Sequence, residues 1–337
     1  MYAACAWAPA TRKLGIQKHL NAVQRGFAQK LTRAYRTVSL NSALLLAGIL
    51  PLDLRIQESA ALYEARKKVP PLSLRDVEIE KVVAYAEAPH PAMHMKLEFT
   101  NLVDQQQVET HSNHAVNIYT DGSKIDGKVG AALSIWDGAG QIKAIKLKLS
   151  PHCTVYQAEL LAICRATRVI KDRKEESFGI YSDSRSALET IANNYAPHPL
   201  AVETRCNLNQ CKLQNKQVSL FWIKAHAGLE GNEQADALAK QAAKDLKCKP
   251  HNDQCPVSFV KRLIRMDSLE EWNRRYKSGT TASVTKMFFP DAVEAYKLVR
   301  KIKPAGILTQ DPQLDALRVS RPSCACDSRA PLRQGLP

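Results

Sequence analysis

Apolar and polar positions change their spacing along the chain, and these changes divide it into segments. In residues 15–68 the apolar residues recur at three- and four-residue steps, which is the period of one helix face. The first such set is Leu20, Val23, Phe27, Leu31 and Tyr35. Ser39 offers a cap for a second helix, and a third is expected from Leu52 to Lys68. The pattern therefore predicts a helical start.

Strand and helix patterns alternate only in residues 114–246. Strands are expected at 116–120, 127–136, 142–149, 179–182 and 218–223, and helices at 156–171, 184–192, 204–214 and 231–244. Thr154 can cap the first of these helices. Three leading strands followed by alternating helices and strands predict an α/β fold: a mixed five-stranded sheet with helices on both faces, flanked by helical segments.

The segments outside the sheet are expected to range from helical to disordered. Residues 1–70 form the helical segment, which the run Val69-Pro70-Pro71 breaks, and residues 71–113 read as a linker with at most one helix. Residues 247–304 form a basic helical tail, with helices near 257–276 and 291–302. Residues 305–337 are rich in Pro, Ser, Arg and Cys and are expected to be disordered.

Composition narrows the cellular setting and the partner. The 337 residues contain no run of 18 apolar positions and no convincing signal peptide, so neither a membrane span nor a membrane partner is expected. Nine irregularly spaced cysteines favour a reducing, intracellular compartment, nuclear or cytoplasmic. The net charge is +15, of which residues 114–246 carry only +3. Basic flanks around a neutral centre favour a polyanionic partner.

Four acidic residues occupy positions from which they could converge. Asp121 and Asp183 follow short predicted strands, where ligands of open α/β sheets bind, and Glu159 and Asp236 lie on predicted helices. Magnesium prefers such oxygen ligands, and two ions can activate water and stabilise the leaving oxygen of a phosphodiester. His226 follows the last strand on a glycine-containing loop. It either moves protons and aids product release or is an ordinary loop histidine.

The motifs around these acids resemble the type 1 ribonuclease H family, and more narrowly the ribonuclease H domain of non-LTR retrotransposon polyproteins. The runs are Tyr119–Ser123, Tyr156–Leu160, Tyr181–Ser184, Trp222–Gly228 and Gly231–Asp236, within about residues 114–246. The resemblance implies endonucleolytic cleavage of the RNA strand of RNA–DNA hybrids with two Mg²⁺ ions, for which Mn²⁺ would substitute. The implied metal ligands are Asp121, Glu159, Asp183 and Asp236, with His226 as a further catalytic residue.

Substrate-binding roles follow from the same resemblance. They fall on Gly122, Ser123, Thr154, Gln157, Ser184 and Asn232, and Glu233 is a weaker candidate for attracting product or metal. The chain departs from relatives that carry asparagines ahead of the second acid, because Val155 and Tyr156 stand there. A lysine- and tryptophan-rich protrusion found in some relatives is also absent between Asp183 and Val218. Affinity for the hybrid would then come from Lys143, Lys146 and Lys148 or from the flanks; alternatively, these lysines form a solvated strand face.

The flanks resemble the same type of element. Residues 24–39 and 47–54 are similar to the segment that follows a reverse transcriptase palm, and no palm motif is present, so polymerase activity is not expected. Cys324 and Cys326 resemble the start of a terminal Cys/His knuckle, but no histidine follows them, so a complete zinc site is not expected.

Two other functions remain open at this point. A catalytically inactive, nucleic-acid-binding remnant of a retroelement would keep the fold without turnover. A DNA-transfer enzyme of the transposase and integrase type would use a related fold, but such enzymes carry three acids and lack the motif from Trp222 to Asp236. The sequence leaves the oligomeric state undetermined.

Overall fold

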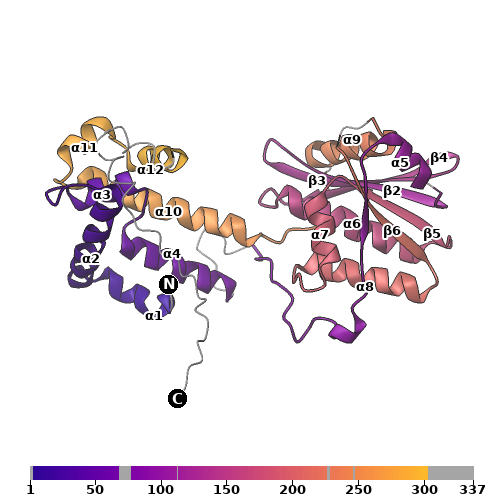
Figure 1. Cartoon of the computed structure of the whole chain (residues 1–337), viewed down its shortest axis with the longest axis horizontal. Helices are drawn as coiled ribbons and strands as arrows, with labels where there is room; N and C mark the ends of the chain where they lie inside the picture. Colours follow the sequence, from indigo (N-terminus) through magenta and orange to yellow (C-terminus); the bar gives the residue numbers. More distant parts are fainter. Residues whose placement is uncertain (1–2, 68–76, 112, 226–227, 246, 303–337) are drawn as a thin grey trace, which may run out of the picture. The chain divides into compact units, whose positions relative to one another are not determined.

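A computed structural model describes residues 3–67, 77–111, 113–225, 228–245 and 247–302. The chain divides into two compact units (Figure 1). The helical unit consists of residues 1–60 and 265–337, and the sheet unit consists of residues 61–264. The boundaries between the units fall within two helices, α4 (Leu52–Arg66) and α10 (Val257–Ser278).

The sheet unit contains one six-stranded sheet in the order β1-β6-β5-β2-β3-β4. Its strands are β1 (Phe99–Leu102), β2 (Val116–Ile125), β3 (Lys128–Asp137), β4 (Gly140–Leu149), β5 (Ser177–Ser182) and β6 (Gln217–Ile223). Strands β2, β3 and β4 pair in antiparallel fashion, whereas β2, β5, β6 and β1 run parallel. The predicted α/β fold with a mixed sheet is confirmed, and all five expected strands are present.

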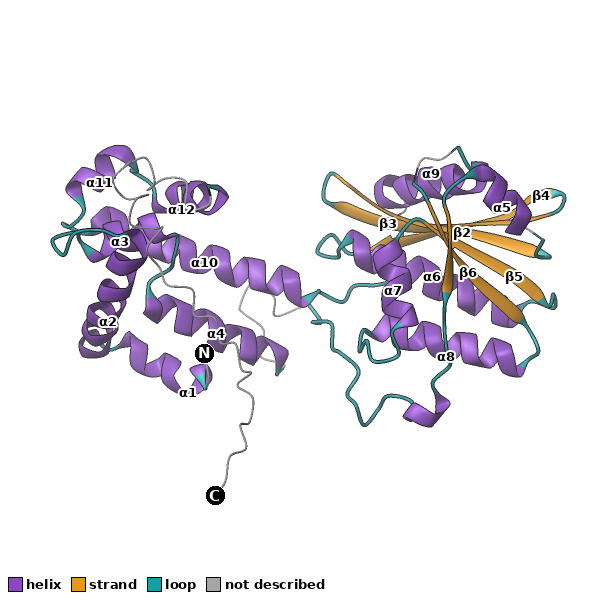
Figure 2. Ribbon diagram, viewed as in Figure 1, coloured by secondary structure: helices purple, strands orange, loops and turns teal. Residues whose placement is uncertain are grey.

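Helices cover both faces of this sheet, as the alternating pattern predicts (Figure 2). One face carries α6 (Val155–Asp172), α7 (Arg185–Ala192) and α8 (Pro199–Leu213), and the other carries α5 (Gln105–His111) and α9 (Glu230–Asp245). The larger core lies between the sheet and α6, where alternate residues of β2 and β3 are fully buried. On the opposite face α9 lies directly on β3, so closely that a Cβ at Gly130 would clash with the backbone nitrogen of Ala243.

The sixth strand corrects the interpretation of residues 71–113 as a linker. β1 pairs in parallel with β6, and α5 follows it and packs Val108 against Leu102 and a stack of Tyr181 and Phe221. A short turn of 3₁₀ helix, Pro91–Met93, precedes them. Only Leu102 of the four strand residues is buried, so β1 has no periodic apolar pattern that a sequence could reveal.

The helical unit brings together segments from both ends of the chain. Its elements are α1 (Ala4–Trp7), a 3₁₀ turn (Ala8–Arg12), α2 (Leu14–Thr32), α3 (Leu40–Ala47), α4, α10, α11 (Ser283–Phe288) and α12 (Ala292–Lys301). Leu44 and Leu45 of α3 share a core with Trp272 and Tyr276 of α10. The predicted cap Ser39 accepts a hydrogen bond from the Ser42 amide at 3.2 Å. No helix in the described ranges is long and apolar enough to cross a membrane.

The first predicted helix ends earlier than expected, and its apolar face is not buried. α2 stops at Thr32, because Arg33 adopts the left-handed conformation with φ 53°, so Tyr35 lies beyond the helix. The apolar stripe from Leu20 to Leu31 does lie on one helix face. However, Val23, Phe27 and Leu31 are exposed rather than packed in the core.

Candidate metal centre in the sheet unit

Two of the four acids lie where the parallel part of the sheet ends. The pairing of β2 with β5 stops at Thr120 and Ser182, and Asp121 and Asp183 are the next residues along the chain. β2 itself continues to Ile125 because it forms a hairpin with β3, in which Asp121 lies opposite Ala132. The expected strand end at Thr120 is therefore wrong for β2 as a whole, although it holds for its parallel pairing.

The third acid reaches this edge because α6 approaches β2 very closely. A Cβ at Gly122 would lie 2.7 Å from the backbone nitrogen of Glu159 and 2.9 Å from the Cβ of Ala158. Only glycine permits this separation between helix and strand. Thr154 holds the start of α6 in a reciprocal capping box with Gln157. The helix start and Gly122 together fix Glu159 beside the two aspartates.

The three carboxylates form one compact group. One oxygen from each of Asp121, Glu159 and Asp183 lies within 4.8 Å of the others. Asp121 and Glu159 are buried, each 6% exposed. The Oε2 atom of Glu159 is buried and has no hydrogen-bond partner among the described residues. A group of three carboxylates with an unsatisfied buried oxygen fits a hard divalent cation, so the residues present suit magnesium.

The crowding of negative charge raises the pKa values of the buried members. Burial, followed by the charges of Asp183 and Asp236, raises the pKa of Asp121 to about 7. Burial and the charges of Asp121 and Asp183 raise the pKa of Glu159 well above its ordinary value. A hydrogen bond from the Gly122 amide opposes both shifts. Without a cation the group thus tends to hold protons at neutral pH.

The fourth acid is close to this group but has a different partner. The Oδ2 atom of Asp236 on α9 accepts a hydrogen bond from the ammonium group of Lys240 at 2.6 Å. Asp236 is not among the three acids whose oxygens lie within 4.8 Å of one another, although its charge acts on Asp121. Lys240 was not among the expected site residues. Its position four residues after Asp236 is a recognisable helical ion-pair spacing.

The structure also shows how the end of β5 is supported. The indole nitrogen of Trp222 on β6 donates a hydrogen bond to the backbone oxygen of Asp183 at 3.0 Å. This contact gives the tryptophan of the predicted motif a role in holding the backbone at the site. His226, the predicted catalytic histidine, lies outside the described residues, and so do Cys324 and Cys326.

The structure gives the position and burial of the expected substrate-binding residues near the acids and on α9. Ser123 and Ser184 are half-buried at the ends of the strand pairing, beside Asp121 and Asp183. Asn232 is buried at the start of α9, and its Oδ1 atom has no partner within the described ranges. Glu233 on the same helix is exposed. The roles of these residues toward a substrate stay predictions.

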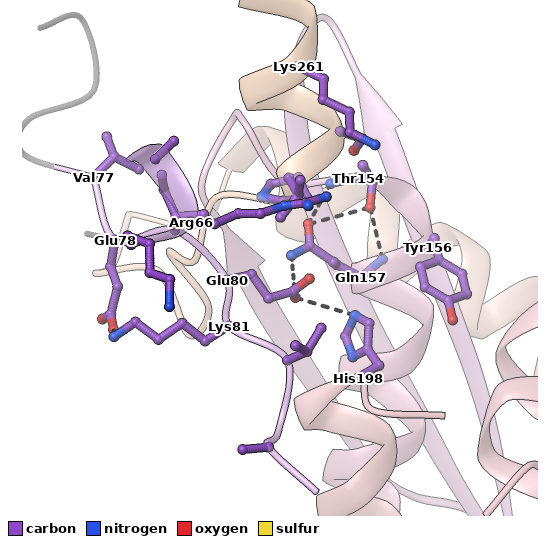
Figure 3. A pocket seen from close by; sticks show the side chains of 18 residues that line it. Arg66, Val77, Glu78, Glu80, Lys81, Thr154, Tyr156, Gln157, His198 and Lys261 are labelled. Atoms are coloured by element: carbon purple, nitrogen blue, oxygen red, sulfur yellow. Dashed lines mark hydrogen bonds and ion pairs between the residues drawn. The ribbon is translucent and has the colours of Figure 1, made fainter. Parts of the chain in front are cut away.

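Thr154 and Gln157 take part in an internal network (Figure 3). Gln157 is 1% exposed, and its side-chain amide donates to the carboxylate of Glu80 at 2.7 Å. Nε2 of His198 lies 3.3 Å from the same carboxylate oxygen. The residues before β1 thus cover the start of α6. Thr154 remains half-buried, whereas Gln157 is buried.

The three lysines of β4 do not form one surface. Lys143 lies opposite Ile135, whereas Lys146 and Lys148 lie opposite Ala132 and Gly130. Side chains alternate between the faces of a sheet, so Lys143 points away from the other two. Lysines on an edge strand also hinder pairing with other chains.

Comparisons with known proteins match the sheet unit. The RNase H family model matches residues 113–244. Ribonuclease H1 of Mus musculus and that of Rattus norvegicus are each 25% identical over 150 residues, which cover 40% of this chain and 52% of the relative. The chain thus spans about half the length of these relatives. The resemblance to ribonuclease H is confirmed for these residues, and the non-LTR retrotransposon context stays a prediction.

Two solved structures are similar over the same part of the chain. RNase H1 from the archaeon Halobacterium salinarum NRC-1 is 20% identical, with 39% of this chain and 98% of that chain covered and a TM-score of 0.32. A foamy viral protease-reverse transcriptase in complex with dsDNA is also 20% identical, with 40% and 97% covered and a TM-score of 0.34.

Proposed function

We propose that this protein hydrolyses the RNA strand of RNA–DNA hybrids endonucleolytically, with divalent metal ions. The observation that carries the proposal is the compact group of Asp121, Glu159 and Asp183 inside the stretch that matches the RNase H family, with a Glu159 oxygen that has no hydrogen-bond partner among the described residues. The relatives named Ribonuclease H1 support the same reaction class.

The metal ligands in this proposal are the three grouped acids and Asp236. Their oxygen-only donor set favours Mg²⁺, with Mn²⁺ as a substitute. When bound, two such ions activate the attacking water and stabilise the leaving oxygen of the phosphodiester. Asp121 and Glu159 must release any proton they hold in order to act as ligands. The ammonium group of Lys240 would compete with the metal for the carboxylate of Asp236.

Other parts of the chain contribute by holding these ligands and the substrate. The Gly122 amide and the Trp222 indole fix the backbone and carboxylate positions at the strand ends. Ser123 and Ser184 lie beside the acids, where contacts to the hybrid backbone are expected. Recognition of the RNA strand would depend on its 2′-hydroxyl groups and on groove shape. His226 would move protons or aid product release.

The proposed setting is a retroelement polyprotein inside the cell. Support comes from the similarity of residues 24–39 and 47–54 to the segment after a reverse transcriptase palm and from the residues of the motifs around the acids. The net charge of +15, concentrated outside residues 114–246, suits a nucleic acid partner.

The test is cleavage of a hybrid labelled on its RNA strand by the full chain, with Mg²⁺ or with EDTA. Single-stranded RNA and duplex DNA serve as alternative substrates. We expect metal-dependent cuts within the RNA of the hybrid only. Asp183→Asn should abolish cleavage and keep the fold, as judged by circular dichroism. Asp126→Asn makes the same chemical change at an exposed turn and should leave cleavage intact.

Each other result selects another function. Hybrid binding without cleavage by the folded chain would select the inactive, nucleic-acid-binding remnant. Cleavage of duplex DNA would select a DNA-transfer enzyme. Metal-dependent cleavage by the Asp183→Asn variant would refute the assignment of the metal ligands.

A further inference from the structure

Helix α2 of the helical unit has its apolar side turned outward. Five apolar residues follow one another at three- and four-residue steps on a single face: Ile16, Leu20, Val23, Phe27 and Leu31. Of these, Ile16 is 39%, Val23 58%, Phe27 65% and Leu31 66% exposed. A helix at the surface of a globular unit ordinarily turns such a stripe toward its own core. We call these five residues the α2 stripe.

The inner side of the same helix is held mainly by polar contacts. The Gln24 amide nitrogen donates to the backbone oxygen of Leu50, and its Oε1 atom accepts from the Leu52 amide, both at 2.7 Å. Gln29 donates to the backbone oxygen of Val38 at 2.8 Å. The small residue Ala28 is fully buried on this side. The orientation of α2 is therefore fixed by specific hydrogen bonds, and the outward stripe is not the result of a loosely attached helix.

Positive charge around the stripe favours an acidic partner. Residues 1–52 contain seven Lys and Arg residues and no Asp or Glu. On a helix with 100° per residue, Lys30 and His19 border the stripe on the side away from the unit's core. A second copy of this chain would bring the same positive charge against itself. A nucleic acid would need cations along the centre of the contact, where the stripe has aliphatic and aromatic side chains.

We propose that the α2 stripe is a docking site for an acidic amphipathic helix of a partner protein. The apolar face of that helix would cover the stripe from Ile16 to Leu31, and its acidic flank would lie beside Lys30. An amphipathic helix binds an apolar surface in this way, through anchor residues at spacings of three and four. The site belongs to the helical unit and is independent of the proposed nuclease function.

The test uses the full chain and a labelled synthetic peptide as the probe. The peptide carries leucines at heptad a and d positions and glutamates at the remaining positions, and binding is followed by fluorescence anisotropy. We expect Phe27→Glu to weaken binding at least about tenfold, because it places a charge at the centre of the stripe. Met287→Glu makes the same kind of change at an 80% exposed position of α11 and should bind like the unchanged protein.

Controls separate folding and charge from docking. Leu31→Gln is a milder second variant, which should weaken binding to a smaller extent and keep the melting temperature. Cleavage of the RNA–DNA hybrid should be the same in all these variants, so loss of docking is distinguishable from loss of nuclease activity. A peptide with lysines in place of the glutamates should not bind.

Three outcomes would overturn the proposal. The first is equal binding of the acidic peptide by the Phe27→Glu and Met287→Glu variants. The second is concentration-dependent dimerisation in analytical ultracentrifugation that Phe27→Glu abolishes, which would assign the stripe to a second copy. The third is displacement of the peptide by a nucleic acid duplex whose own binding requires Phe27, which would assign the stripe to nucleic acid.

Discussion

Asp121→Asn should stabilise the metal-free protein at high pH, although the same change should abolish catalysis. The pKa of the Asp121 carboxyl is about 7 in the folded protein and 3.8 in the unfolded chain. Between these values the folded state binds more protons than the unfolded state, so the free energy of unfolding falls as the pH rises. The stabilising effect of the proton is complete below about pH 4 and is lost above about pH 7.

The size of the effect follows from the difference between the two pKa values. A shift of about three units corresponds to about 4 kcal/mol, at about 1.4 kcal/mol for each unit. Because Asp121 is 6% exposed, solvent screens little of this interaction. Asparagine has nearly the same shape and no charge, so the variant should be more stable by up to about 4 kcal/mol at about pH 8.5. At about pH 4.5 the gain should fall to roughly 1 kcal/mol.

Hydrogen exchange in EDTA, followed by mass spectrometry on peptides from residues 116–137, reports the sheet unit without interference from the helical unit. Asp126→Asn is the matched control, because its exposed carboxylate should give no pH-dependent gain. Saturating Mg²⁺ should raise the free energy of unfolding of the unchanged protein. The stability difference from Asp121→Asn at high pH should then narrow or reverse, since the cations neutralise the carboxylates as protons do at low pH. Parallel pH curves for the two proteins would refute the electrostatic reasoning.

Two further changes test the geometry around the acids. Gly122→Ala should destabilise the sheet unit by about 1–3 kcal/mol and impair cleavage, since the added Cβ would meet the Glu159 backbone, whereas Gly138→Ala has open space and should be near neutral in a denaturant titration. Lys240→Met should lower the Mg²⁺ concentration needed for half-maximal thermal stabilisation, because the ammonium group no longer competes for Asp236; an unchanged or higher concentration would contradict that competition.

The sequence predicts those parts of the sheet that have a local signal. The capping box of Thr154 and Gln157, the glycines of the β3–β4 hairpin and the apolar run of β5 each mark an element through nearby residues. Local signals also place Asp183 directly after its strand. Motif spacing identified the three acids that the structure groups together, because each lies close to the end of a strand pairing or to the start of a helix.

Long-range packing explains what the sequence could not predict. β1 exists because β6 offers a parallel edge, and its own four residues carry no pattern. The core shared by α3 and α10 joins residues more than two hundred positions apart, which no periodicity reveals. The outward stripe of α2 has the period of a buried face, and only the tertiary contacts of Gln24 and Gln29 show which side packs.

The pairing of Asp236 with Lys240 follows from the charge that the site must accommodate. Three grouped carboxylates and a nearby fourth would repel one another strongly without cations. This repulsion adds to burial in raising the pKa of Asp121, through Asp183 and Asp236, and the pKa of Glu159, through Asp121 and Asp183. Protonation relieves part of this repulsion, and the ion pair of Asp236 with the Lys240 ammonium group relieves a further part. Bound divalent ions would take the place of both the protons and the ammonium group. Metal binding should therefore release protons from the acid group and free Lys240, and isothermal titration calorimetry in buffers of different ionisation enthalpy would measure that release.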